Sequence, residues 1–185
     1  MRAFVSIGCD ALAEEIRAAR RPFRGVDGLR PVDPEDAHVT LKFLGDIPSE
    51  RLPALDEALS AAVAAADVTP FDLELVGYGA FPSRDYISVV WLGVGEGSEA
   101  ATRLHEAVEE RTVELGFDPE EHDFTPHVTI ARMDHAGGKE RVQELLERDP
   151  TVGRTRIEEV RLTESTLTDD GPVYDTVSRY PLTGE

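Results

Sequence analysis

The chain has 185 residues, 41% of them hydrophobic, which is enough to build one well-packed domain. No apolar run approaches the roughly 20 residues that span a bilayer, and residues 1–9 lack the pattern of a signal peptide, so we expect no membrane association. Cys9 is the only cysteine, which excludes an internal disulfide and a cysteine-based zinc site. We therefore expect a cytoplasmic protein.

The charge balance is strongly acidic, with 37 Asp and Glu against 19 Lys and Arg and a net charge of −18. One interpretation is a very soluble surface. The interpretation we favour is a halophilic protein, because the Debye length falls to about 3 Å near 1 M salt and like charges then repel weakly. Either way, a broad basic face for non-specific nucleic-acid binding is excluded, and any RNA would be held locally by its end.

The predicted elements repeat the order strand, helix, strand, helix, strand. In the first half we expect strands over 2–9, 38–44 and 71–78, helices over 10–20 and 49–66 with Asp10 and Ser49 as N-caps, and a loop over 21–36. In the second half we expect strands over 86–94, 127–133 and 156–166, helices over 98–115 and 139–148, and an edge strand over 173–180.

The two halves also match at residue level, in His38-Val39-Thr40-Leu41 and His127-Val128-Thr129-Ile130. Two copies of one α+β unit predict two lobes, roughly 1–80 and 81–185, that face each other across a central cleft. No low-complexity linker separates them. We therefore expect one rigid bilobal domain over 1–185, with the last strand able to return to the first lobe.

The repeated motif combines an imidazole with a hydroxyl. On a strand, residues i and i+2 share a face, so His38 and Thr40 point one way and the aliphatic residues between and after them point the other. A single His-x-Thr is usually a hydrogen-bonded structural histidine. Two copies at equivalent places instead favour a paired site, with His127 and Thr129 as the second pair.

Two such pairs suit phosphodiester chemistry. One neutral histidine can activate a nucleophile while a protonated one supplies a proton to the leaving group. The hydroxyls of Thr40 and Thr129 can donate hydrogen bonds to phosphoryl oxygens. A dinuclear metal site is the competing idea, but it would need carboxylates beside the histidines, so we expect no metal.

The sequence resembles the two-histidine (2H) phosphoesterases, and within them the RNA 2′,3′-cyclic phosphodiesterases historically called 2′-5′ RNA ligases. The resemblance runs nearly the full length and rests on the segments Met1–Ile7, His38–Gly45, Gly79–Ser83, Val90–Val94, Phe124–Arg132, Glu164–Leu167 and Gly171–Tyr174. The aromatic residue that often precedes the first motif, near Pro31-Val32, and the basic residue near Asp85-Tyr86 are missing here.

This resemblance implies a bilobal α+β fold with two antiparallel sheets lining the cleft, and no cofactor. It implies hydrolysis of a 2′,3′-cyclic phosphate at an RNA 3′ end, or on a nucleoside, to a 2′-phosphate. It also implies a possible reversible 2′-5′ ligase activity on tRNA halves. We expect a monomer, and which histidine is acid and which base stays open.

Two basic residues are further candidates for substrate binding. Lys42 continues the alternation of His38 and Thr40 and should face the cleft. Arg132 follows the second motif, where the family pattern places a phosphate ligand. Strict alternation would turn it away from His127, although a strand end or a bulge could redirect it.

The remaining histidines and aromatic residues carry no predicted role in the chemistry. We expect His105 at the surface of its helix, and we expect core positions for four aromatic side chains: Phe43, Phe81, Trp91 and Phe124. The alternative function is a non-catalytic nucleotide- or RNA-end-binding module of the same fold. Hydrolysis of a nucleoside 2′,3′-cyclic phosphate would discriminate between the two.

Overall fold

A computed structural model of the chain describes residues 1–183. The strands are β1 (Arg2–Gly8), β2 (Leu29–Pro31), β3 (His38–Asp46), β4 (Phe71–Pro82), β5 (Ile87–Val94), β6 (His127–Met133), β7 (Thr151–Ile157), β8 (Glu159–Thr168) and β9 (Gly171–Pro181). The α-helices are α1 (Ala13–Arg20), α2 (Leu52–Ala66), α3 (Ser98–Glu114) and α4 (Lys139–Leu146). The order of helices and strands confirms the α+β class.

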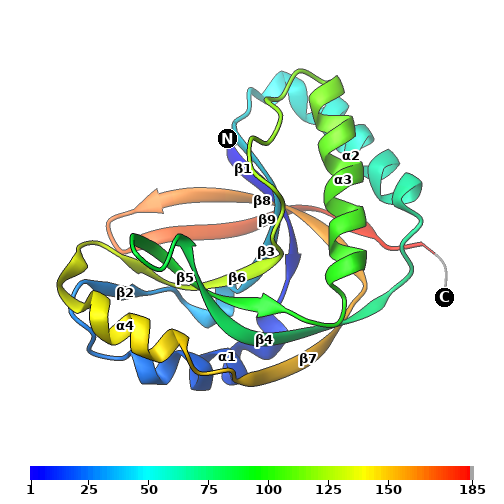
Figure 1. The fold of residues 1–185 in the computed structure, drawn as a ribbon. Helices are drawn as coiled ribbons and strands as arrows, with labels where there is room; N and C mark the ends of the chain where they lie inside the picture. The colour runs from blue at the N-terminus through cyan, green and yellow to red at the C-terminus, as the bar shows by residue number, and fades with distance from the viewer. Residues whose placement is uncertain (184–185) are drawn as a thin grey trace.

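The nine strands form one curled antiparallel sheet in the order β7-β4-β5-β6-β3-β1-β8-β9, with β2 paired to β6 (Figure 1). The expectation of two separate sheets is therefore wrong. The two halves of the sheet are joined where β3 meets β6, through the pair Val39 and Val128. Sequence patterning sets the face of each strand, whereas this join depends on how the two halves meet in space.

Each half of the sheet has its own pair of helices. The helices α2 and α3 pack on each other and lie against the half that contains β1, β3, β8 and β9, while α1 and α4 lie against the half that contains β4 to β7 (Figure 1). The helix α1 follows β1 but covers the other half, and α3 follows β5 but contacts β3. The expected boundary near residue 80 lies inside β4, in the part from Leu75 to Pro82 that pairs with β5.

The single strand expected over 156–166 is two strands. The chain leaves β7 at Ile157, passes Glu158 and enters β8, and these strands pair with β4 and β1 in opposite halves of the sheet. The loop expected over 21–36 contains the short strand β2. The helices expected from Asp10 and Ser49 begin instead with 3-10 turns, and neither residue forms the side-chain cap that we predicted.

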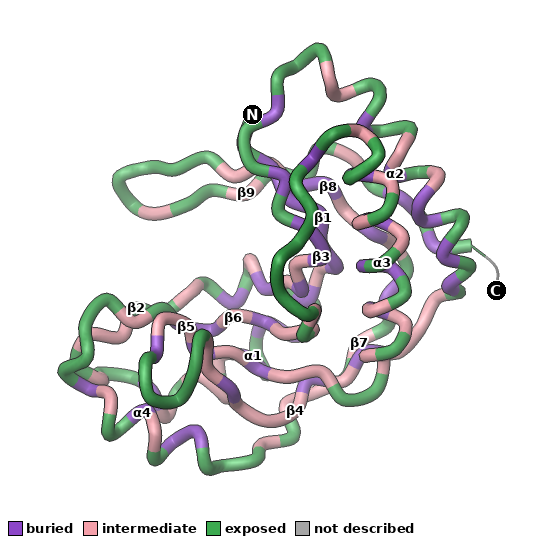
Figure 2. The backbone as a smooth tube through the Cα atoms, turned by 45° about the horizontal axis from the view of Figure 1, so that its top comes forward, coloured by how far each residue is buried: buried purple, intermediate pink, exposed green. Residues whose placement is uncertain are grey.

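The core lies between the sheet and its helices, where the buried segments in Figure 2 concentrate. The aliphatic residues of the two motifs belong to it, since Val39, Leu41, Val128 and Ile130 are at most 2% exposed. Each such side chain stabilises the fold by about 1.5–3 kcal/mol relative to exposure. Their burial leaves the histidine and threonine of each motif on the opposite face of the sheet, as the alternation predicts. No helix within residues 1–183 is long and apolar enough to cross a membrane.

Candidate active site

The two motifs meet at the junction of the two halves of the sheet. The antiparallel pair of Val39 with Val128 is the centre of this junction. This pair is flanked by His38 and Thr40 on β3 and by His127 and Thr129 on β6, and the charge of His127 acts on His38. The structure therefore brings the two motifs together at one junction, each with its histidine and threonine on the face opposite its buried aliphatic residues.

Each histidine ring is held by a backbone carbonyl two residues earlier in the chain. The Nδ1 of His38 lies 2.8 Å from the carbonyl oxygen of Asp36, and the Nδ1 of His127 lies 2.6 Å from that of Thr125. Because a carbonyl only accepts hydrogen bonds, each Nδ1 carries the proton and donates it. In the neutral ring, Nε2 is then the atom that can accept or deliver a proton.

Aromatic rings pack against both histidines. His38 stacks on Phe4 at 4.7 Å between ring centroids and meets Tyr174 edge-on at 5.8 Å. His127 meets Phe81 edge-on at 4.8 Å and Trp91 at 5.7 Å. These rings restrict both imidazoles to one orientation and shield them partly from water.

This shielding affects proton binding. Burial, the largest influence, lowers the pKa of His38, and the positive charge available on His127 and Arg132 lowers it further, against the opposing effect of the Asp36 carbonyl. The pKa of His127 is lowered by burial and by Arg132, and the Thr125 carbonyl opposes this. Both histidines are therefore biased toward the neutral form until a negatively charged group enters the site.

Arg132 reaches the same face as the histidines because β6 contains a bulge. Val90 of β5 pairs with Ala131 and Trp91 pairs with Thr129, so Ile130 is the extra residue of the bulge. Ile130 and Ala131 are both buried, and the alternation of buried and exposed side chains therefore resumes one residue later, at Arg132. The Arg132 side chain is exposed, and its charge acts on His38, His127 and Tyr174 alike. The bulge therefore overrides the strict alternation that would have turned Arg132 away.

The same kind of bulge in β3 has the opposite consequence for Lys42. Consecutive residues of β1 pair with Thr40 and with Lys42, so Leu41 is the extra residue of this bulge. As a result, Leu41 and Lys42 are both buried. The Nζ of Lys42 lies 2.7 Å from Oε2 of Glu109 and 2.6 Å from the carbonyl oxygen of Asp118. Lys42 does line the cavity that Thr40 and His127 also line, as expected, but its ammonium group is already paired with a carboxylate on α3.

His105 is another residue that the sequence misplaced. It is buried, its ring stacks on Phe124 at 4.2 Å between centroids with 5° between the planes, and its Nδ1 lies 2.8 Å from the carbonyl oxygen of Leu41. It thus connects the bulge after the first motif to the segment that leads into the second. The helical spacing from Ala101 and Leu104, both fully buried, is the signal that could have shown this.

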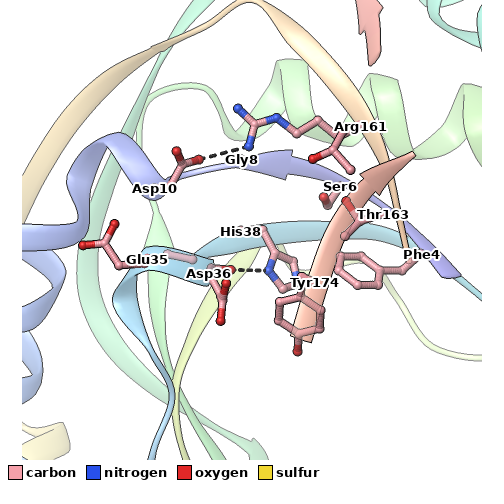
Figure 3. A pocket seen from close by; sticks show the side chains of 12 residues that line it. Phe4, Ser6, Gly8, Asp10, Glu35, Asp36, His38, Arg161, Thr163 and Tyr174 are labelled. Atoms are coloured by element: carbon pink, nitrogen blue, oxygen red, sulfur yellow. Dashed lines mark hydrogen bonds and ion pairs between the residues drawn. The ribbon is translucent and has the colours of Figure 1, made fainter. Parts of the chain in front are cut away.

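The aromatic expectations need correction, because none of the four side chains is fully buried. Phe81 and Trp91 pack on His127, and Phe124 packs against the edge of the core. Phe43, predicted to lie in the core, is 66% exposed, because the bulge turns it outward at the position that corresponds to Arg132. It lines a cavity of about 520 Å³ next to His127, together with Phe81 and Phe124. His38 lines a different cavity, of about 150 Å³ (Figure 3). Sequence reasoning also missed the contacts of Phe4 and Tyr174 with His38, because both residues are far from the two motifs along the chain.

Within residues 1–183, no group of three or more His, Cys, Asp and Glu side chains is arranged to hold a metal ion. The four motif residues and Arg132 offer instead two proton-transfer groups, two hydroxyl donors and one guanidinium. These are the groups that a phosphodiester would need on its reacting and non-bridging oxygens.

Comparison with known proteins agrees with this arrangement. Residues 9–169 match the model of the 2′-5′ RNA ligase superfamily. An RNA 2′,3′-cyclic phosphodiesterase of Archaeoglobus fulgidus is 34% identical over 177 residues, covering 94% of this chain and 96% of the relative. A crystal structure from Thermus thermophilus has a TM-score of 0.82 at 28% identity and covers 100% of both chains. The structure of E. coli LigT complexed with 3′-AMP has a TM-score of 0.76 at 25% identity, covering 99% of this chain and 98% of LigT.

Proposed function

The chain belongs to the 2′-5′ RNA ligase superfamily, and from this membership we propose that it is an RNA 2′,3′-cyclic phosphodiesterase with His38 and His127 as its acid–base pair. The observation that carries the proposal is the pairing of Val39 with Val128, which sets two histidines and two threonines on one face. A binding module would not need two proton-transfer groups at one junction.

The proposed reaction is an attack of water on the phosphorus of the cyclic ester. A neutral imidazole accepts a proton from the water at Nε2 while the new P–O bond forms. The bond from phosphorus to the 3′ oxygen breaks, and the other imidazole, protonated, gives its proton to that oxygen. The product is a 2′-phosphate with a free 3′-hydroxyl. A 5′-hydroxyl in place of water would produce a 2′-5′ linkage by the same steps.

The neighbouring groups would stabilise the charge that develops. The hydroxyls of Thr40 and Thr129 would donate to the non-bridging oxygens, and Arg132 can hold two of these oxygens at once. The aromatic cavity beside His127 would hold the nucleoside, with Phe43 available to stack on the base. The bound 3′-AMP of LigT supports nucleotides as the class of ligand. The two histidines have similar environments, so either can be the base.

The direct test is hydrolysis of adenosine 2′,3′-cyclic phosphate in the presence of EDTA. We expect the 2′-phosphate as product and no change in rate on chelation, because the proposed steps use only side chains. Activity that EDTA abolishes and a divalent ion restores would instead indicate a metallophosphoesterase. Binding of the nucleotide without turnover would indicate the non-catalytic module.

The dependence of the rate on pH is a second prediction. One histidine must be neutral and the other protonated, so kcat/KM should follow a bell-shaped dependence on pH. Its two sides report the pKa values of the two histidines in the free protein. Because burial lowers both pKa values, the maximum should lie below the ordinary histidine value of about 6.5. The bound phosphate carries negative charge, which raises both values, so the profile of kcat should lie at higher pH. A maximum of kcat/KM above pH 7 would contradict this electrostatic account.

A further inference from the structure

A cavity on the far side of the sheet from the two histidines takes no part in the proposed reaction. It has a volume of about 380 Å³ and lies between α1, the 3-10 turn that follows α1, and the short strand β2 (Figure 1). Ala131 of β6 and its partner Pro31 of β2 line it, so it lies on the face of these strands opposite to Arg132. Within residues 1–183, it shares no lining residue with the cavities beside His38 and His127. Its volume is in the range of small-molecule sites, about 300–1,000 Å³.

Four arginine side chains line this cavity, although the chain as a whole is acidic. They are Arg17, Arg20, Arg21 and Arg24. The segment 17–30 holds five of the chain's 19 basic residues and one acidic residue, whereas the whole chain has 37 acidic residues. The overall composition, with its net charge of −18, would not produce a locally positive cavity by chance placement of side chains.

Most of this positive charge is not balanced by carboxylates. Among the four arginines, the ion pairs formed within residues 1–183 are those of Arg17, which is paired with Glu14 and Glu35. Arg21 and Arg24 are exposed and also line the cavity, so their guanidinium groups can reach a ligand inside it.

Arg20 is half-buried and already oriented. It donates a hydrogen bond to the carbonyl oxygen of Val32, which holds its side chain beside the end of β2. Burial, the largest influence, and the charge of Arg17 lower the pKa of Arg20, and the charge of Asp33 opposes this. The surroundings therefore disfavour the positive charge of Arg20, and a bound anion would relieve this cost.

The remaining walls of the cavity are apolar. Phe23 is 3% exposed, and Leu29, Pro31 and Ala131 lie beside it. Apolar walls lower the local dielectric constant and so strengthen the attraction between a guanidinium and an anion. A guanidinium can hold two phosphate oxygens at once, and a phosphate has more charge and more terminal oxygens than a carboxylate to share among three arginines.

We propose that this cavity binds a phosphate group with two or more negative charges, held by Arg20, Arg21 and Arg24, at a site separate from the catalytic one. The phosphate can be inorganic, or it can belong to a small organic molecule whose apolar part lies on Phe23 and Leu29. None of these residues takes part in the hydrolysis proposed above, so the site does not depend on that proposal.

Titrations of the protein with pyrophosphate and with phenyl phosphate, followed by two-dimensional amide NMR, test the site. We expect the amide resonances of residues 20–29 to shift with either probe. Tighter binding of pyrophosphate would identify an inorganic phosphate as the ligand, and tighter binding of phenyl phosphate would identify an organic one. Arg21→Gln and Arg24→Gln each remove one exposed charge. Each should weaken the binding seen at residues 20–29 about twofold to fivefold, the effect of losing one exposed ion pair.

Two control variants separate this site from general charge and from the catalytic site. Arg156→Gln removes the same charge from an exposed position on β7 and should leave the binding unchanged. Arg132→Gln removes the guanidinium on the catalytic face and should leave the shifts of residues 20–29 unchanged. An equal loss of binding in Arg156→Gln would show a diffuse effect of charge and would overturn the site. The same conclusion would follow if residues 20–29 did not shift, or if only Arg132→Gln weakened the binding, because the probes would then occupy the catalytic site alone.

Discussion

His38→Ala and His127→Ala are each expected to lower kcat for cyclic-phosphate hydrolysis by about 10²–10⁴-fold, the usual effect of losing a general acid or base. In the proposed mechanism one ring accepts the proton of the water and the other protonates the leaving oxygen, so neither can replace the other. Each is held at Nδ1 by its own carbonyl, and each alanine variant removes the Nε2 that transfers the proton. Steady-state rates and thermal unfolding of the same preparations would measure the effect.

The control for these variants is His135→Ala. His135 is exposed, and its ring accepts a hydrogen bond from the backbone of Gly137 rather than facing the site. This variant should keep the wild-type rate. If His38→Ala or His127→Ala retained more than about a tenth of the rate with a normal melting curve, the two-histidine mechanism would be wrong.

Lys42→Met is expected to destabilise the fold by about 1.5–3 kcal/mol, because it removes the charged partner of Glu109 and of the Asp118 carbonyl. The Lys42 side chain is 1% exposed and the Glu109 side chain 21%, so the carboxylate left behind is only partly solvated. Burial, the largest influence, raises the pKa of Glu109, but Lys42 and the amide of Glu120 together keep it below its ordinary value. Urea unfolding monitored by circular dichroism would measure the loss.

The double variant Lys42→Met/Glu109→Leu separates the charge from the packing. Removing both partners leaves no unpaired buried charge, so it should recover most of the lost stability. Unchanged unfolding of Lys42→Met would contradict the ion pair. Recovery of stability without activity would be consistent with a role for the 116–126 segment in positioning His127, since Lys42 also bonds the carbonyl of Asp118.

The local pattern of the sequence was sufficient for most of the helices and strands and for the faces of the two motifs. Alternation along a strand depends only on backbone geometry, so burial of Val39 and Val128 already implied that His38 and His127 would face away from the core. The duplication then predicted that two such faces would be used together, and the structure brings them together through one residue pair. The long helices, with apolar residues on one face, were predicted to within a few residues at each end.

The sequence carried no signal for features that depend on a partner strand. A bulge is defined by the register between two strands, so the burial of Lys42 and the outward turn of Arg132 and Phe43 could not be predicted from alternation alone. The division of 156–166 into β7 and β8 has the same origin, because the two pieces pair with strands in opposite halves of the sheet.

By itself, then, the sequence determined the α+β class and the two repeated His-x-Thr motifs, since each follows from local periodicity and residue chemistry. Only the tertiary structure decided that the strands form one sheet, that Lys42 neutralises Glu109, and that Phe4 and Tyr174 pack on His38. These features join residues far apart in the chain. Their formation depends on which strands and helices pack together, and no window of the sequence contains that information.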